Sequence, residues 1–337
     1  MSNPIDLSSF DANGPGLEGK LFGLPFAPEN ASVVIVPVPW EATVTYGTGT
    51  ADGPSAMLKA SRQVDFFMRD IPNAWQLGVA MQGLPTDIKV ESLRVRELAR
   101  YVRDRPEADP SVIASKINEA CESLNVFVKR TCEELLDAGK VVGVLGGDHS
   151  TPLGLMRALS QRHDRFGILQ IDAHADLRKA YEGFIYSHGS IMFNALKMPA
   201  VHKLTQVGIR DLCEEEFRLI VQNKSRIKTF FDEEIHAVSN SRELCEQIVR
   251  ELPEKVYISF DIDGLDPKLC PHTGTPVPGG LDFYFATSLI RAVVKSRRKI
   301  IGFDLCEVAP GPADDWDANV GSRILWHLAC WAAVSNR

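Results

Sequence analysis

The sequence predicts an α/β fold in three layers, with helices on both faces of a central, mostly parallel sheet. The first observation is a series of short segments that are apolar on both sides, as buried parallel strands are. These segments are residues 33–38, 141–145, 166–171, 204–209, 256–260 and 300–305. The second observation is that helical patterns lie between them, which gives the strand–helix alternation of α/β proteins.

Helices are predicted where apolar residues recur every three or four positions. The longest spans residues 114–138, and Gly139 directly after it is a typical helix end. Residues 241–252 and 283–295 show the same spacing. Residues 70–112 fit least well, because they hold several prolines, one charged helical stretch and no clear strand. We therefore expect them to form an excursion on the surface.

The chain is predicted to hold one domain after an N-terminal arm. Residues 1–30 are rich in Gly, Pro, Asn and Ser, which predicts an irregular arm. Residues 31–337 contain no linker, internal repeat or low-complexity segment, so we expect a single catalytic domain there. With 45% hydrophobic residues, such a domain needs no disulfide bonds to stabilise its core.

Composition excludes several classes of protein. A formal charge of −7 disfavours a nucleic-acid partner, which usually requires a basic patch. No apolar run reaches the roughly 20 residues that span a bilayer, and the first residues lack the pattern of a signal peptide. The seven cysteines show no C-x-x-C spacing, which favours free thiols. We expect a cytoplasmic protein without a nucleic-acid or membrane partner.

Polar residues follow three of the predicted strands, where core residues would be out of place. Residues 146–150 read GGDHS, residues 172–176 read DAHAD and residues 261–267 read DIDGLDP. Ligands of open α/β sheets bind at the carboxyl ends of the strands, and all three segments begin there. Each alone could be a tight turn or a capping cluster. Their occurrence together indicates a site.

The spacing of these residues predicts a metal centre. Side chains two residues apart in an extended chain point to the same side. Asp172, His174 and Asp176 should therefore share one direction, and so should Asp261 and Asp263. Together with the histidine of GGDHS, four carboxylates and two imidazoles converge, and two divalent cations would balance the four negative charges. Such ligands suit Mn²⁺ better than a thiolate-preferring metal, with Ni²⁺, Co²⁺, Fe²⁺ and Zn²⁺ as alternatives.

The three segments resemble the metal-binding motifs of the ureohydrolase family of arginases and agmatinases. GGDHS, DAHADLR and SFDIDGLDP match without a missing ligand, and residues 36–54 resemble the family's early loop. The resemblance covers roughly residues 30–335 and implies an arginase-like fold, a homo-oligomer of three or six chains and a small guanidino substrate. It also implies two metal ions with shared ligands: His149, Asp172, Asp176 and Asp261 for one, and Asp172, His174, Asp261 and Asp263 for the other.

The same resemblance implies the catalytic roles. The ions lower the pKa of a water molecule that attacks the guanidinium carbon, giving urea and an amine, and Asp176 aims this water. His188 resembles the proton shuttle, a role that suits an imidazole of ordinary pKa, although a structural loop histidine is the alternative. Glu307 resembles the carboxylate that binds the guanidinium through paired hydrogen bonds. Thr275 lies in the H-T-G-T-P loop, which resembles a wall of the substrate pocket.

The substrate is less closely defined. Arginases place small polar residues after the D-x-H-x-D segment, whereas residues 177–183 here read LRKAYEG and look like the agmatinase branch. We therefore expect hydrolysis of agmatine to putrescine and urea, with arginine or another guanidine as the alternative. Arg178 would favour a guanidino acid such as guanidinobutyrate if it faced the pocket, but a surface or intersubunit salt bridge is its ordinary role. More distant alternatives are a dinuclear phosphoesterase, a deacetylase-like amide hydrolase with one zinc ion, and a non-enzymatic subunit.

Overall fold

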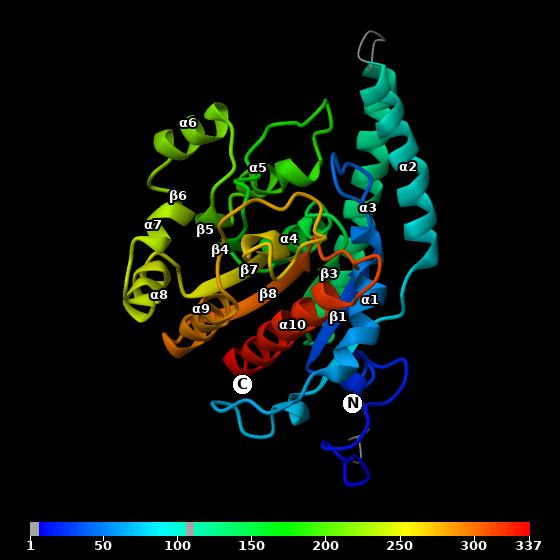
Figure 1. Cartoon of the computed structure of the whole chain (residues 1–337), viewed down its shortest axis with the longest axis vertical. Helices are drawn as coiled ribbons and strands as arrows, with labels where there is room; N and C mark the ends of the chain where they lie inside the picture. Colours follow the sequence, from blue (N-terminus) through cyan, green and yellow to red (C-terminus); the bar gives the residue numbers. More distant parts are fainter. Residues whose placement is uncertain (1–6, 106–110) are drawn as a thin grey trace.

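A single parallel sheet forms the centre of the molecule (Figure 1). The computed structural model describes residues 7–105 and 111–337, so residues 1–6 of the predicted arm and 106–110 of the predicted excursion lie outside it. Within these ranges eight strands pair in the order β2-β1-β3-β8-β7-β4-β5-β6, and every pair is parallel. The strands are β1 (Val33–Val38), β2 (Val79–Met81), β3 (Val141–Gly146), β4 (Phe166–Ile171), β5 (Val201–Ile209), β6 (Ile227–Phe231), β7 (Lys255–Asp261) and β8 (Lys299–Cys306).

All six predicted strands are present, and the two that the sequence pattern missed lie at the edges of the sheet. β2 pairs with β1 inside the region 70–112, so the expectation of no strand there is wrong. Its three residues are too few to form a recognisable apolar run. β6 exposes Lys228, as an edge strand does, which breaks the pattern of a strand buried on both faces.

Helices cover both faces of the sheet, which confirms the three-layer α/β/α architecture (Figure 1). α1, α9 and α10 pack together on one face, and α3 and α4 on the other. The helices are α1 (Gly53–Ala60), α2 (Thr86–Asp104), α3 (Ser111–Asp137), α4 (Leu153–Ser160), α5 (Ile191–Leu196), α6 (Glu214–Gln222), α7 (Asp232–His236), α8 (Ser241–Arg250), α9 (Phe283–Lys295) and α10 (Trp316–Ser335). Among the described residues, no helix is long and apolar enough to cross a membrane.

The parallel arrangement decides where a site can form. The carboxyl ends of all strands meet at one edge of the sheet, and the loops that leave them gather above it. The charged stretch of the region 70–112 forms α2, which lies beside α3 at one side of the molecule (Figure 1).

Candidate active site

The six predicted metal ligands come together at the ends of three strands, β3, β4 and β7, near the centre of the sheet. One histidine follows β3, three residues follow β4, and the remaining two are the last residue of β7 and a residue of the short 3-10 turn after it. In the sheet, β7 lies next to β4 and only β8 separates it from β3. We call the six residues the floor of the site: His149, Asp172, His174, Asp176, Asp261 and Asp263.

The floor has the geometry of a cation site. His149 Nδ1 lies 3.0 Å from a carboxylate oxygen of Asp172 and of Asp176, and 3.2 Å from one of Asp261. Yet within the described part of the chain this buried nitrogen has no partner in hydrogen-bond geometry. Donor atoms that crowd together without bonding to one another are suited to surround a shared ion.

Two overlapping groups of ligand atoms can be distinguished. One comprises His149, Asp172 and Asp176, and the other Asp172, His174 and Asp263, each with its ligand atoms within 4.8 Å of one another. Asp172 belongs to both groups. The oxygen-rich donor set with two imidazoles therefore fits two divalent cations held side by side.

Hydrogen bonds behind the floor orient its ligands. His149 Nε2 lies 2.9 Å from the hydroxyl of Ser259, which donates to Asp304 at 2.9 Å. Gln170 donates its amide to Asp172 at 2.8 Å. These contacts turn His149 Nδ1 and the carboxylate of Asp172 toward the cluster, as supporting residues of metal ligands commonly do.

The backbone of the floor differs from the extended chain that the sequence predicted. Asp263 lies in a 3-10 turn, and Asp176 has a φ of 55°, in the left-handed region that costs a residue with a side chain conformational energy. Backbone N–H groups hold the carboxylates of the 3-10 turn, because Ala173 N donates to the side chain of Asp263 and Asp263 N donates to that of Asp261. The carboxylates converge through tight turns rather than through the alternation of a strand.

Electrostatics confirm that the carboxylates of the floor crowd one another. Burial and the charge of Asp172 raise the pKa of Asp176 to about 7. Burial and the neighbouring Asp263 likewise raise the pKa of Asp172 and, well above its usual range, that of Asp261. Burial opposes the charged form of His174, but the carboxylates of Asp263, Asp172 and Asp176 together outweigh it and raise the pKa to about 10. Without a cation the floor must retain protons, which divalent ions would displace.

His188 lies in a 3-10 turn above the floor and contacts the loop after β1. Its Nδ1 is 3.3 Å from the hydroxyl of Thr43, which also accepts a hydrogen bond from His188 N at 3.3 Å. Burial, followed by the positive charges of His174 and Arg103, lowers the pKa of His188 to about 3. The imidazole is therefore neutral at pH 7 and a weaker base than a histidine of ordinary pKa.

Glu307 follows β8 and is buried beside the floor. One carboxylate oxygen accepts a hydrogen bond from His149 N at 2.9 Å, while Thr273 donates to its carbonyl at 2.8 Å. Among the described residues, its second carboxylate oxygen has no hydrogen-bond partner. Burial and the charges of Asp261 and Asp148 raise the pKa of Glu307 well above its usual range. Within residues 7–105 and 111–337, this carboxyl group therefore has no cationic partner.

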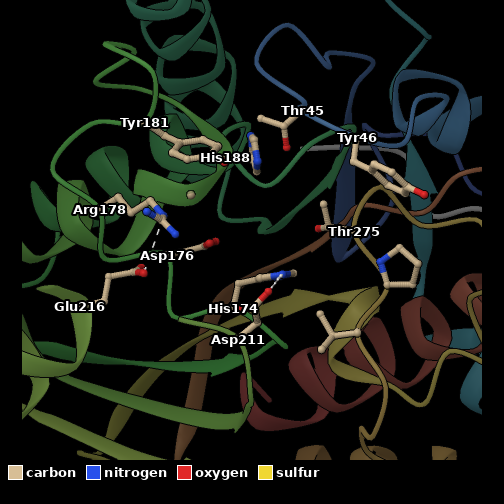
Figure 2. Close-up of a pocket in the computed structure, with 13 residues that line it drawn as sticks. Thr45, Tyr46, His174, Asp176, Arg178, Tyr181, His188, Asp211, Glu216 and Thr275 are labelled. Carbon is tan, nitrogen blue, oxygen red and sulfur yellow. Dashed lines mark ion pairs between the residues drawn. The ribbon is translucent and has the colours of Figure 1, made fainter. Parts of the chain in front are cut away.

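A cavity of about 290 Å³ opens above the floor (Figure 2). His174, Asp176 and His188 contribute to its lining, and the predicted wall residue Thr275 lies there too. We call the other side chains around it the rim: Thr45, Tyr46, Arg178, Tyr181, Asp211, Glu216 and Thr275. The rim comes from the loops after β1, β4, β5 and β7 and from the first turn of α6.

Arg178 lines this cavity, but its charge is paired. Its Nε lies 3.7 Å from Glu216, and its guanidinium lies over the ring of Tyr181 at 4.8 Å (Figure 2). Glu216 also accepts hydrogen bonds from Leu177 N and Cys213 N, both at 2.9 Å, which fix its position. Arg178 therefore faces the cavity and also forms a salt bridge within the chain, so it combines the two roles that the sequence left open.

Sequence reasoning missed several rim residues. Asp211 follows the predicted strand 204–209, so the rule that drew attention to the other strand ends applies to it as well. Tyr46 lies within residues 36–54, which were singled out only because they resemble the early loop of the family. Glu216 shows no signal beyond its position in the first turn of a helix, where acidic residues are common.

A parallel α/β sheet with carboxylates and imidazoles gathered at its strand ends defines the class of α/β metallohydrolases. The model of the arginase family matches residues 31–330, and the chain belongs to that family. It is therefore a hydrolase of linear amidine C–N bonds, from a family that depends on a binuclear metal centre.

Individual relatives agree with this assignment. The N(1)-aminopropylagmatine ureohydrolase of Thermus thermophilus is 32% identical over 84% of each chain. The guanidinobutyrase of Pseudomonas aeruginosa is 30% identical over 73% of this chain and 79% of its own. The agmatine ureohydrolase of Thermoplasma volcanium superposes with a TM-score of 0.74 over 96% of both chains, and at 22% identity this likeness concerns the fold.

Proposed function

We propose that the protein releases urea from a guanidine without a carboxylate, either agmatine or its N1-aminopropyl derivative. The observation that carries this proposal is the charge of the rim. Asp211 and Glu216 are its acids and Arg178 is its base, and the charge of Arg178 is already paired with Glu216. Asp211 lies 3.8 Å from Nε2 of His174, and once His174 is neutral as a metal ligand the 64% exposed carboxylate of Asp211 would be free to pair with a cationic tail.

The floor would hold two divalent ions, and we propose Mn²⁺ for both. His149, Asp172 and Asp176 fit one ion, Asp172, His174 and Asp263 fit the other, and Asp261 lies beside the first group. When bound, the ions would lower the pKa of water so that it can serve as a nucleophile near neutral pH. Asp176 also lines the cavity, where its carboxylate would orient the attacking water by a hydrogen bond.

Two further residues would complete the reaction. The unpartnered carboxylate oxygen of Glu307 would accept a hydrogen bond from the substrate guanidinium. Burial favours the protonated form of Glu307, and the positive charge of the guanidinium would stabilise the ionised form instead. His188, which lines the cavity, would accept the proton released by water and transfer it to the leaving amine. Water and the guanidinium thus yield urea and the protonated amine.

A guanidino acid such as guanidinobutyrate is the second candidate, because Arg178 does face the cavity. Its carboxylate would have to replace Glu216 as the partner of Arg178. Since backbone donors hold Glu216 in place, we rank this candidate second.

Urea release tests the proposal directly. Protein loaded with Mn²⁺, Ni²⁺, Co²⁺, Fe²⁺ or Zn²⁺ would be given agmatine, N1-aminopropylagmatine, guanidinobutyrate, arginine or a generic phosphoester. We expect the two amines to give the highest kcat/KM with Mn²⁺, and His174→Ala to abolish the activity. Faster turnover of guanidinobutyrate would overturn the substrate, and phosphate release without urea would overturn the reaction.

We also propose that the protein is a cytoplasmic homo-oligomer of three or six chains. The number of chains is proposed by analogy with the family. All seven cysteines lie in the described ranges and are free thiols, which suits a reducing compartment. Light scattering coupled to size-exclusion chromatography would measure this number, and a monomer would contradict it.

A further inference from the structure

Helix α2 sends two arginines to the loops that line the cavity, although the helix itself lies at the side of the molecule (Figure 1). Arg96 and Arg103 are seven residues apart, which is close to two helical turns and places both on one face. Arg96 pairs with the buried carboxylate of Glu41, which lies near the start of the loop after β1. Arg103 reaches the same loop further along.

Glu41 closes the base of this loop. Its second carboxylate oxygen accepts hydrogen bonds from Gly49 N at 2.7 Å and from Ala51 N at 3.2 Å. The ion pair with Arg96 therefore anchors the start and the end of the segment 41–51 to α2.

Arg103 joins the tip of this loop to a second one. Its guanidinium donates to the carbonyl oxygens of Val44 at 2.7 Å and Thr43 at 2.9 Å. Its Nε pairs with Glu182, which lies in the turn that leads to His188. The Arg103 side chain is only 18% exposed, so solvent screens these contacts less than those of a surface pair.

The two loops carry groups that the reaction needs. Thr43 contacts both the ring and the backbone N–H of His188, and Thr45 and Tyr46 follow it into the rim. A shift of Thr43 would therefore move His188 and one wall of the cavity together. We propose that Arg103 is a positioning residue, which holds the loop 41–49 and the loop 181–190 in register so that His188 meets the substrate.

The catalytic part of this inference rests on the proposed function, and kinetics test it. Arg103→Ala should lower kcat/KM on the order of 10²-fold, mainly through kcat, because misplacement of a catalytic group by about 1 Å has such an effect. Arg103→Lys should recover part of the loss, since one ammonium cannot make the forked contact of a guanidinium. Arg100→Ala is the matched control, because Arg100 lies on the same helix and contacts Glu97 in an exposed pair. It should match the wild type.

The structural part is tested without any turnover. Hydrogen exchange should accelerate in residues 41–49 and 181–190 of Arg103→Ala and remain unchanged in Arg100→Ala, while metal content stays at the wild-type level. If no guanidine is hydrolysed, the proposed function fails, but this measurement still decides whether Arg103 holds the loops. Should Arg103→Ala not fold, Glu182→Gln removes one contact and takes its place.

A double-mutant cycle asks whether Arg103 acts through Thr43. Thr43→Val removes the hydroxyl that contacts His188 but keeps the carbonyl that Arg103 binds. If the two residues act together, the kcat loss of the double variant is smaller than the product of the single losses. Unchanged exchange in both loops, together with a kcat/KM within about twofold of the wild type, would overturn the proposal.

Discussion

The floor and the rim of the site come from different parts of the fold and differ in burial. Five of the six floor residues are at most 5% exposed, and all six stand at or just beyond the ends of sheet strands. Apart from Glu216, which is buried in the first turn of α6, the rim lies on loops, and it includes Tyr46, which is 83% exposed, and Asp211. The sheet therefore positions the residues that would carry out the reaction, whereas the loops determine which substrates can reach those residues. Changes in the floor should affect every substrate, and changes in the rim should distinguish between substrates.

The largest expected effect follows from Asp172→Asn in the floor. Asp172 belongs to both ligand groups, so its loss should release metal and lower kcat for every guanidine on the order of 10³-fold or more. Urea release and metal analysis of the same preparation would measure both effects. Asp164→Asn is the control, because this exposed residue precedes β4 at the opposite edge of the sheet. Full metal content with near-normal kcat would contradict the assignment of the floor.

Glu307→Gln should give the next largest effect. Glutamine keeps the acceptor for His149 N but loses the charge, and a hydrogen bond to a charged group contributes about 1.5–3 kcal/mol. We expect kcat/KM to fall roughly 10- to 100-fold, with unchanged metal content. Steady-state kinetics and metal analysis would test this against Glu254→Gln, an exposed glutamate at the start of β7. Loss of metal instead would mean that Glu307 supports the floor rather than the substrate.

Removal of the metal should make the folded protein less stable as the pH rises. The pKa values of Asp172, Asp176 and Asp261 are raised in the folded protein, and so is that of His174. The folded state then holds protons that the unfolded state releases, so this stability is present below about pH 4 and is lost as pH rises. The loss runs through about pH 7 for Asp176 and about pH 10 for His174.

Calorimetry of chelator-treated protein would measure this effect. From pH 5.5 to pH 8 the melting temperature should fall by roughly 5–10 °C, as a loss of a few kcal/mol implies for a domain of this size. Mn²⁺ should restore it most at pH 8. The lowered pKa of Asp263 acts in the opposite sense only below its ordinary value of 3.8, and that of His188 only below its ordinary value of 6.5. A metal-free protein that becomes more stable at pH 8 would show that the floor does not crowd its charges.

The same division explains what the sequence could predict. The floor was predictable because each ligand follows an apolar strand within a few residues, and parallel strands bring their carboxyl ends together. The direction of the Arg178 side chain was not predictable, because it depends on a salt bridge with Glu216, which lies in the first turn of α6. The contacts of Arg103 with two distant loops were not predictable for the same reason. Helical spacing shows which residues share a face of α2, but not which loops pack against that face.

The smallest expected effect concerns Asp211, and it separates the rim from the floor. Asp211→Asn should raise KM for agmatine and N1-aminopropylagmatine roughly two- to fivefold, because exposed charge pairs contribute about 0.2–1 kcal/mol. Its kcat should stay near the wild-type value, since Asp211 belongs to neither ligand group and lies 3.8 Å from Nε2 of His174, whereas Nδ1 faces the floor. For guanidinobutyrate, whose tail is negative, KM should fall instead. Parallel kinetics on the three substrates, with Asp164→Asn as control, would decide the matter. An equal change for all three would place Asp211 with the floor and remove the main support for a cationic tail.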